Sequence, residues 1–270
     1  MLSKIIYQLN KKRYFLQFDK INFSWTINLF SFFIFLIFIN GCNKEEEIED
    51  SFVPTKSNSI NQILPLGASR VEGARPKYES FRYELWKDLT EAGFTFDFIG
   101  LYFDDANYPE KHNDLFDRNH QGNSGATTSD ILNDIDDWSS LYTPDIVLFS
   151  SPGGNDALEN LPLSNTIDNI NYIIDEIQYI NPNVTILIEQ LAPAESSIMT
   201  DALSYYMSQL HQAVHLIAKK KSTQTSKIIA IDMFTNFSDQ LLADDVHYNN
   251  LGASFIAQKY YDVLSLELKN

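Results

Sequence analysis

Residues 63–69 read Ile-Leu-Pro-Leu-Gly-Ala-Ser, a short apolar run that ends in a glycine and a serine. Such a run predicts a short buried strand followed by a turn. Pro65 argues against an ordinary central strand, because proline cannot donate to the hydrogen-bond ladder. A serine directly after a strand is a candidate functional residue, because parallel sheets bind ligands at the carboxyl ends of their strands.

The chain beyond Ser69 alternates helix and strand patterns. Apolar runs predict strands at residues 96–99, 145–149, 184–188 and 228–231, and helical spacing predicts helices at 80–92, 128–138, 167–177, 199–221 and 251–268. Residues 101–127 form a long loop rich in Asp, Asn, His and Gly, and loops of this length are usually functional or disordered. The alternation predicts one α/β domain over residues 60–268, with helices on both faces of a parallel sheet.

Composition excludes several classes of protein. The 270 residues include 36 acidic and 20 basic side chains, a formal net charge of -16, and a single cysteine. An apolar fraction of 44% is ordinary for a globular chain and excludes wholesale disorder. A lone cysteine excludes an internal disulfide framework. The acidic balance argues against nucleic-acid binding, which needs clustered lysine and arginine.

Residues 1–41 differ from the rest, with basic side chains, a charge-free apolar run at 29–39 and then Gly41-Cys42. This pattern predicts a secretory signal, and its Gly-Cys end resembles the lipobox of bacterial lipoproteins, which implies lipid on Cys42. We predict a signal peptide over 1–41, a flexible acidic tether over 42–59, and an exported protein anchored to the bacterial envelope, at the outer membrane or cell surface. The alternative is a transmembrane anchor over residues 21–39.

Ser69, His247 and Asp244 form a candidate catalytic triad. A serine hydroxyl is a weak nucleophile and needs a base within hydrogen-bond reach, and histidine is the natural base near neutral pH. Asp244 precedes His247 by three residues and can reach its other ring nitrogen to fix the tautomer. This spacing favours Asp244 over Asp245.

The reaction also needs donors for the oxyanion of an attacked ester. Candidates are the backbone N–H groups of Ser69 and Gly125 and the side-chain amide of Asn155, which follows Gly153-Gly154 after a predicted strand. Gly125 has no side chain, so its backbone can approach a substrate closely. No metal or cofactor is implied.

The four sequence blocks around Ser69, Gly125, Asn155 and His247, in this order, resemble those of the SGNH hydrolases, also called GDSL-type esterases. The resemblance covers residues 60–268 and implies a flavodoxin-like, three-layer α/β/α sandwich with a five-stranded parallel sheet. A closer resemblance, to the acetylxylan esterases of carbohydrate esterase family 3, is carried by residues 64–69, 72–73, 83–85 and 119–125. The family pattern is not kept throughout: Ala68 stands for an aspartate, Asn119 and Gln121 for two acids, and Ala126 for an aromatic residue.

Other residues have structural alternatives. His120 either lines the site or is held by a backbone hydrogen bond, and Asp156 is expected to support the loop that carries Asn155. His211 and His215 have metal-ligand spacing but lack the accompanying acid, so we interpret them as packing or surface residues. Four aromatic residues of the long loop either stack on a sugar ring or form the loop's own core: Tyr102, Phe103, Tyr108 and Phe116.

The combined pattern predicts a monomeric, lipid-anchored serine esterase that removes acetyl or other short acyl groups from carbohydrate. The polar side chains after Ser69 and before Gly125, among them Arg70 and Gln121, suit sugars rather than a lipid groove. One alternative is a lysophospholipase or thioesterase on the same fold. A second is a non-catalytic surface lipoprotein that binds glycans.

Overall fold

The computed structural model describes residues 60–269. The predicted signal peptide, tether and lipidated Cys42 lie outside these residues. Between residues 60 and 269, no helix is both long and apolar enough to cross a membrane. The strands are β1 (Gln62–Gly67), β2 (Asp97–Phe98), β3 (Tyr102–Phe103), β4 (Asn119–Gly122), β5 (Ile146–Phe149), β6 (Thr185–Gln190) and β7 (Ile228–Asp232). The helices are α2 (Ser69–Glu72), α3 (Arg82–Glu91), α4 (Thr128–Asn133), α5 (Ile135–Ser139), α6 (Gly154–Leu158), α7 (Leu163–Ile180), α8 (Asp201–Lys221), the 3-10 turn η1 (Asp239–Leu241) and α9 (Asn250–Glu267).

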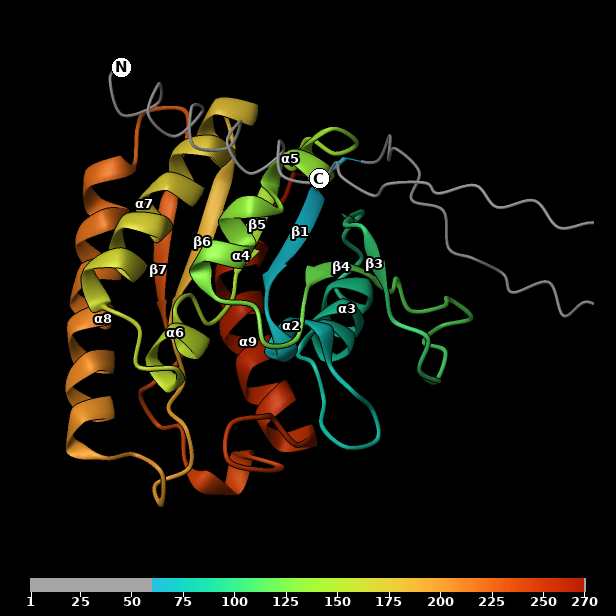
Figure 1. The fold of residues 1–270 in the computed structure, drawn as a ribbon. Coiled ribbons are helices and arrows are strands. Elements are labelled where there is room, and N and C mark those ends of the chain that lie inside the picture. Colours follow the sequence, from blue (N-terminus) through green and yellow to red (C-terminus); the bar gives the residue numbers. More distant parts are fainter. Residues whose placement is uncertain (1–59, 270) are drawn as a thin grey trace, which may run out of the picture. The chain divides into compact units, whose positions relative to one another are not determined.

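The strands form one sheet in the order β3-β4-β1-β5-β6-β7, with β2 also paired to β1. All pairs are parallel except β3 with β4. The chain leaves β1 toward β2 and β4 on one side and reaches β5 on the other (Figure 1). The strand order therefore reverses at β1, and such a reversal opens a crevice at the carboxyl ends of the strands.

Pro65 lies in the middle of a central strand, contrary to the expectation from its missing N–H. On one side, β1 pairs with β2 at Gln62 and Ile63 and with β4 at Leu66 and Gly67. Residue 65 faces that side, because the carbonyls of Ile63 and Gly67 both accept hydrogen bonds there. The proline thus falls in the gap between two partner strands, where no ladder donor is required.

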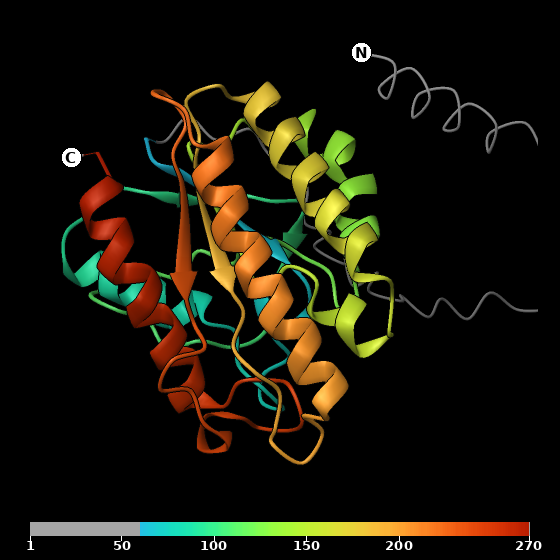
Figure 2. The same cartoon turned by 90° about the vertical axis from the view of Figure 1, so that its left-hand side faces the viewer.

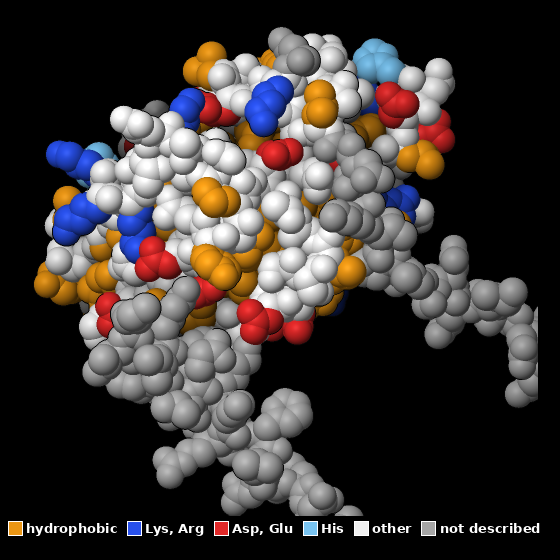
Figure 3. Space-filling model, turned by 90° about the horizontal axis from the view of Figure 1, so that it is seen from above, with side chains coloured by type: hydrophobic (Ala, Val, Ile, Leu, Met, Phe, Trp, Pro, Cys, Tyr) orange, Lys and Arg blue, Asp and Glu red, His pale blue; other side chains and the backbone are white. Residues whose placement is uncertain are grey.

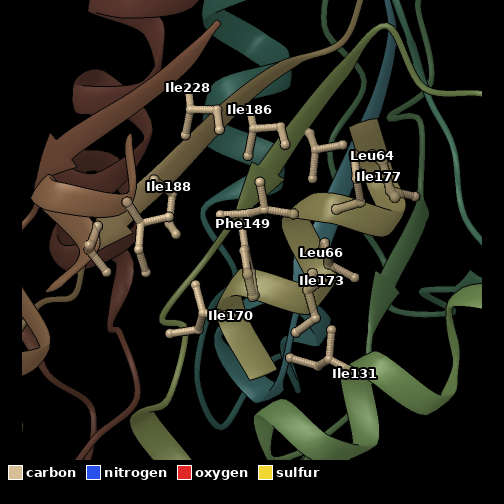
Figure 4. Close-up of a cluster of buried hydrophobic side chains, with 14 of the residues drawn as sticks. Leu64, Leu66, Ile131, Phe149, Ile170, Ile173, Ile177, Ile186, Ile188 and Ile228 are labelled. Atoms are coloured by element: carbon tan, nitrogen blue, oxygen red, sulfur yellow. The ribbon is translucent and has the colours of Figure 1, made fainter. Parts of the chain in front are cut away.

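Helices cover both faces of the sheet (Figures 1 and 2). One face packs against α4, α5, α7 and α8 through a cluster rich in isoleucine. Figure 4 shows Ile170, Ile173 and Ile177 of α7 meeting side chains from β1, β5 and β6. Each such buried side chain stabilises the fold by about 1.5–3 kcal/mol relative to exposure.

The other face packs against α3 and α9. Alternate residues of the same strands point there, including Ile63 of β1, Leu148 of β5 and Leu187 of β6. Phe81 and Tyr260, both fully buried, pack ring to ring with centroids 4.8 Å apart. The domain is therefore the predicted α/β/α sandwich.

Two short strands were not expected. The segment predicted as a loop over residues 101–127 contains β3 and β4, so the sheet has two more strands than the five predicted and one of them is antiparallel. The helix expected at 128–138 is divided into α4 and α5, and Thr127 caps α4 in a capping box with Asp130.

The two ends of the sheet differ. At the amino ends of the strands, seen from above in Figure 3, basic and acidic side chains are scattered among polar and apolar ones. The carboxyl ends lie at the bottom of Figure 1, near α2, α6 and the chain leading into α9. The predicted site residues are found there.

Candidate active site

Four loops bring the predicted site residues to the carboxyl ends of the strands. Ser69 is the first residue of α2, directly after β1, and Asn155 lies in α6, after β5. Gly125 lies between β4 and α4, and His247 precedes α9. Ser69 and Asn155 line one cavity.

Ser69, His247 and Asp244 form a continuous hydrogen-bonded chain. Ser69 Oγ lies 2.9 Å from His247 Nε2. His247 Nδ1 lies 2.8 Å from Asp244 Oδ2 and 3.0 Å from Oδ1. The carboxylate favours the tautomer with the proton on Nδ1, which leaves Nε2 to accept the Ser69 hydroxyl. This is the arrangement that nucleophilic catalysis by serine requires.

Hydrogen bonds stabilise the ionised form of Asp244. Partial burial opposes its charge, but the backbone N–H groups of Val246 and His247 donate to it and, with the His247 ring, keep the pKa of Asp244 below its ordinary value. Both aspartates are exposed, but it is the Asp244 carboxylate that lies against His247 Nδ1, whereas the backbone carbonyl of Asp245 accepts the N–H of Glu195. The structure therefore brings Asp244, and not Asp245, to the histidine.

Asn155 and Gly125 lie on neighbouring loops. The Asn155 amide donates to the carbonyl of Ala126 at 2.8 Å, which ties it to the residue after Gly125 and leaves its second N–H for another acceptor. Gly125 has φ +80°, a left-handed conformation that favours glycine. Gly122 allows the loop to approach α2, because a Cβ there would lie 2.6 Å from the Glu72 nitrogen.

The cavity beside Ser69 is small and largely apolar. It has a volume of about 50 Å³ and includes Leu191, Leu203 and Met207 among its walls. A larger groove of about 830 Å³ shares Ala194 and Met207 with it and runs along α8. The expectation that the site has no apolar groove nearby was therefore wrong, because α8 and the 190–199 segment approach Ser69 from far along the chain.

Arg70 was expected to face a sugar, but it points into the protein and is only 8% exposed. Its guanidinium donates to the carbonyls of Val246 at 2.8 Å, Ala192 at 2.9 Å and Pro193 at 3.1 Å. It also lies over the ring of Tyr248, 4.7 Å from the centroid. Arg70 thus joins the serine helix to the segment that carries His247.

Tyr78 is a site residue that the sequence analysis missed. Its ring stacks on that of His247, with centroids 3.8 Å apart and an interplanar angle of 10°. The backbone N–H of Glu79 donates to the carbonyl of Tyr248 at 2.8 Å and holds the two segments together. No local pattern in residues 73–79 indicates this contact, because its partner lies far along the chain.

A buried carboxylate supports the loop after β5. Glu189 is fully buried, and its Oε2 accepts the N–H of Ser151 at 2.7 Å while Oε1 accepts the Tyr260 hydroxyl at 2.7 Å. Burial raises the pKa of Glu189, and these hydrogen bonds oppose that rise. Ser151 has φ +47°, a strained conformation for serine that this carboxylate helps to hold.

Asp156 has the supporting role that the sequence suggested. It is 2% exposed. Its Oδ2 accepts the Thr128 N–H at 2.8 Å, and its Oδ1 accepts the hydroxyls of Thr128 at 2.5 Å and Thr166 at 3.0 Å. It therefore fixes α6 against α4 and α7.

His120 is held by a backbone hydrogen bond, one of the two roles considered, and it also lines a cavity at the end of α2 away from Ser69. It is 2% exposed, and the N–H of Gly122 donates to its Nδ1 at 3.1 Å. Burial, with a contribution from Arg82, lowers the pKa of His120 to about 2, so its ring is neutral. Gln121 was expected to suit sugars but is buried, with its Oε1 accepting the N–H of Leu101.

His211 and His215, which we interpreted as packing or surface residues, lie on α8. His211 Nε2 lies 3.0 Å from the carbonyl of Leu191, and its ring packs edge-on against Phe234. Both histidines line the groove along α8. In the part of the chain that the structure describes, no group of three or more His, Cys, Asp or Glu side chains is placed to hold a metal ion.

Fold and site together define the class of SGNH hydrolases. The chain belongs to the GDSL-like Lipase/Acylhydrolase family, whose sequence pattern matches residues 89–254. The match includes Gly125, Asn155, Asp244 and His247 and begins after Ser69. The protein is an ester-hydrolysing enzyme. No curated protein matches the chain by sequence.

Solved structures agree with this assignment. A carbohydrate esterase family 3 protein from Talaromyces cellulolyticus is 25% identical with a TM-score of 0.67, covering 77% of this chain and 98% of its own. A family 3 carbohydrate esterase from Clostridium thermocellum is 27% identical with a TM-score of 0.61, covering 78% and 100%. A lipase/acylhydrolase from Enterococcus faecalis, 16% identical with a TM-score of 0.58 over 78% and 98%, shares the fold.

Proposed function

We propose that the protein is a serine esterase that removes acetyl or other short acyl groups from carbohydrate. The observation that carries this proposal is the chain of hydrogen bonds from Ser69 through His247 to Asp244. The small cavity beside Ser69 supports a short acyl group, and the likeness to two carbohydrate esterases of family 3 supports a carbohydrate substrate.

The mechanism follows from the positions of these groups. Ser69 Oγ attacks the ester carbon while its proton passes to His247 Nε2, and Asp244 stabilises the imidazolium. The N–H groups of Ser69, Gly125 and Asn155 are proposed to bind the oxyanion. The imidazolium then protonates the departing sugar hydroxyl, leaving an acyl-enzyme. A water molecule, deprotonated by His247, attacks it and releases the carboxylic acid and free Ser69.

The location of the enzyme in the cell is proposed from the sequence. Residues 1–41 would direct export, and lipid on Cys42 would anchor the enzyme to the bacterial envelope through the 42–59 tether. Metabolic labelling with a fatty-acid analogue tests this: the wild type should be labelled and Cys42→Ser should not. An unlabelled wild-type chain that keeps residues 1–41 would instead support the membrane anchor.

Catalysis is tested by acetate release from an acetylated polysaccharide such as xylan, with labelling by a fluorophosphonate. The wild type should release acetate and react with the probe at Ser69, and Ser69→Ala should do neither while folding normally. Labelling at another serine, or activity retained in Ser69→Ala, would reject the triad. A wild type that is unlabelled and inactive would support the non-catalytic glycan-binding alternative.

The second candidate is hydrolysis of longer acyl esters, as by a lysophospholipase or thioesterase. The groove of about 830 Å³ along α8 is the observation in its favour, because it shares Ala194 and Met207 with the cavity at Ser69. Kinetics on esters from acetyl to long acyl chains separates the two. The kcat/KM of a short-chain enzyme falls for acyl chains longer than butyryl, whereas that of a lipid esterase rises with each added methylene.

A further inference from the structure

A second cavity, of about 250 Å³, lies at the opposite end of α2 from Ser69. Its walls come from the end of α2, the start of the 73–79 segment, β3 with the residues after it, and the end of β4. The lining includes two aromatic rings and several hydrogen-bonding side chains: Glu72, Arg75, Tyr102, Phe103, Asp104, Asp105 and Asn123.

Residues that line this cavity adjoin residues of the active site along the chain. Glu72 follows Ser69 by three residues on α2, so the two side chains are neighbours on one helix face. Glu72 Oε2 also accepts the N–H of Ser124, next to Gly125, at 2.6 Å. Arg75 lies in the 73–79 segment, whose Tyr78 stacks on His247. This adjacency places the cavity beside the site at which a substrate's ester would lie.

Two aromatic rings form an exposed wall. Tyr102 is 38% exposed and Phe103 is 44% exposed. Their strand β3 is paired residue by residue with β4, at His120 and Asn119, so the backbone that carries both rings is fixed. Tyr108 and Phe116 have a different role: they pack against Tyr83 and form the loop's own core.

The polar groups of the cavity favour a neutral ligand rich in hydroxyl groups. Asp105 and Asn123 are exposed, and Glu72 is partly so. Of the three carboxylates in the lining, Asp104 is paired with Arg82 at 3.0 Å, and the cation Arg75 is paired with Glu79 at 3.1 Å. The negative charge of the cavity therefore comes from Glu72 and Asp105, with Arg118 nearby, 5.6 Å from the centroid of the Phe103 ring. A negative cavity repels acidic sugars. Aromatic faces attract the slightly positive C–H groups of a sugar ring, and carboxylates accept its hydroxyl groups.

We propose that this cavity is a subsite for the sugar chain that carries the ester, with Tyr102 and Phe103 stacking on sugar rings and Glu72 and Asp105 accepting hydroxyl groups. It takes neutral chains and not uronic-acid chains. The inference rests on the proposed function, because it assigns part of the same substrate to a second location.

The test compares one large and one small substrate. Tyr102→Ala and Phe103→Ala should each raise the KM for acetylated xylo-oligosaccharide about tenfold, with kcat little changed. Hydrolysis of 4-nitrophenyl acetate, too small to reach the cavity, should stay within a factor of two of wild type. Tyr205→Ala is the matched control, because Tyr205 is a 67%-exposed tyrosine on α8 and should affect neither substrate.

Binding without catalysis gives a second readout. Isothermal titration of Ser69→Ala with xylohexaose, mannohexaose and cellohexaose should show binding of at least one, lost on adding Tyr102→Ala. Oligogalacturonate should not bind. The subsite would be overturned if the variants lost equal activity on both ester substrates, or lost none on the acetylated oligosaccharide. Failure of all three neutral chains to bind would also overturn it. The proposed function is judged separately, by whether the wild type releases acetate from any glycan.

Discussion

The ring of Tyr78 lies flat against the ring of His247, with centroids 3.8 Å apart and planes 10° apart. His247 is also held from its edge by Asp244 and faces Ser69 with Nε2. The imidazole is therefore fixed in its plane by the carboxylate and from above by the tyrosine. Tyr78 acts through His247, as a positioning residue.

Tyr78→Ala should lower kcat by up to about tenfold with little change in KM, because an aromatic pair contributes about 0.5–1.5 kcal/mol beyond its buried area. Tyr78→Phe keeps the ring and should keep most of the activity. The kinetics of both variants on 4-nitrophenyl acetate check this. A phenylalanine variant as impaired as the alanine variant would show that stacking is not what matters.

Arg70 joins α2 to two other segments, because it donates to the backbone carbonyl of Val246 and to those of Ala192 and Pro193. Arg70→Met leaves these acceptors in a buried place without their donor, so the free energy of unfolding should fall by about 2–4 kcal/mol. The kcat should also fall at temperatures where the variant is folded, because Val246 precedes His247. Arg70→Lys should recover part of both.

Urea unfolding and kinetics measure the two effects of Arg70 separately. Lys220→Met is the matched control, since Lys220 is exposed on α8 and its loss changes the net charge equally. A methionine variant with lowered stability but unchanged kcat would limit Arg70 to holding the fold.

Much of the fold could be predicted because it depends on local pattern. The continuous apolar runs of β5 and β6 and the isoleucine spacing of α7 are visible in the sequence and place the carboxyl ends of the strands. β4 could not be predicted in this way. Its residues, Asn119 to Gly122, are polar or glycine, and its burial comes from β1 and α2 rather than from its own composition.

The candidate triad could be proposed because each member stands in a short motif. Arg70 and Tyr78 stand in no motif, and their roles come from contacts with Val246 and His247 that only the folded chain brings near. A charged residue beside a nucleophile is ordinarily exposed. Arg70 is buried instead, because three carbonyls at the ends of other segments converge on it and satisfy its donors.

Asp244→Asn should lower kcat by about a thousand- to ten-thousandfold, because an amide favours the wrong tautomer of His247. Asp245→Asn should stay within a factor of two of wild type, since the carboxylate that lies against His247 Nδ1 is that of Asp244. Steady-state kinetics on 4-nitrophenyl acetate compares these adjacent residues. The opposite ranking would assign the orienting role to Asp245.

His120 should make the domain sensitive to acid. Its pKa is lowered to about 2 in the folded protein, whereas an unfolded histidine titrates near 6.5. The unfolded state thus binds the extra proton first as the pH falls. The contribution of His120 to the free energy of unfolding is fully present above pH ~6.5. It is lost as the pH falls, by at most about 1.4 kcal/mol per pH unit.

Asp117 acts in the opposite direction, because burial raises its pKa to about 7 and its contribution to stability grows as the pH falls. The comparison must therefore be between wild type and His120→Asn, in which the amide oxygen can still accept the Gly122 N–H. Urea unfolding from about pH 7 to pH 5 should give a shallower loss of stability in the variant. Parallel curves would mean that His120 does not contribute to acid sensitivity.

Acyl-chain length should be set where the Ser69 cavity meets the groove along α8. Met207 is 5% exposed and lines both, and the cavity on the Ser69 side measures only about 50 Å³. The wild type should therefore prefer acetyl esters, and its kcat/KM should decline beyond about butyryl.

Met207→Ala removes this boundary and opens the cavity into the groove. Because each buried methylene contributes about 0.8 kcal/mol, kcat/KM of the variant should rise roughly fourfold per methylene over the first few added. Met199→Ala is the control, since Met199 lines only the groove and should leave the preference unchanged. A 4-nitrophenyl ester series from acetyl to octanoyl measures all three proteins. A wild type that already gains steeply through octanoyl would move the assignment to the longer acyl esters.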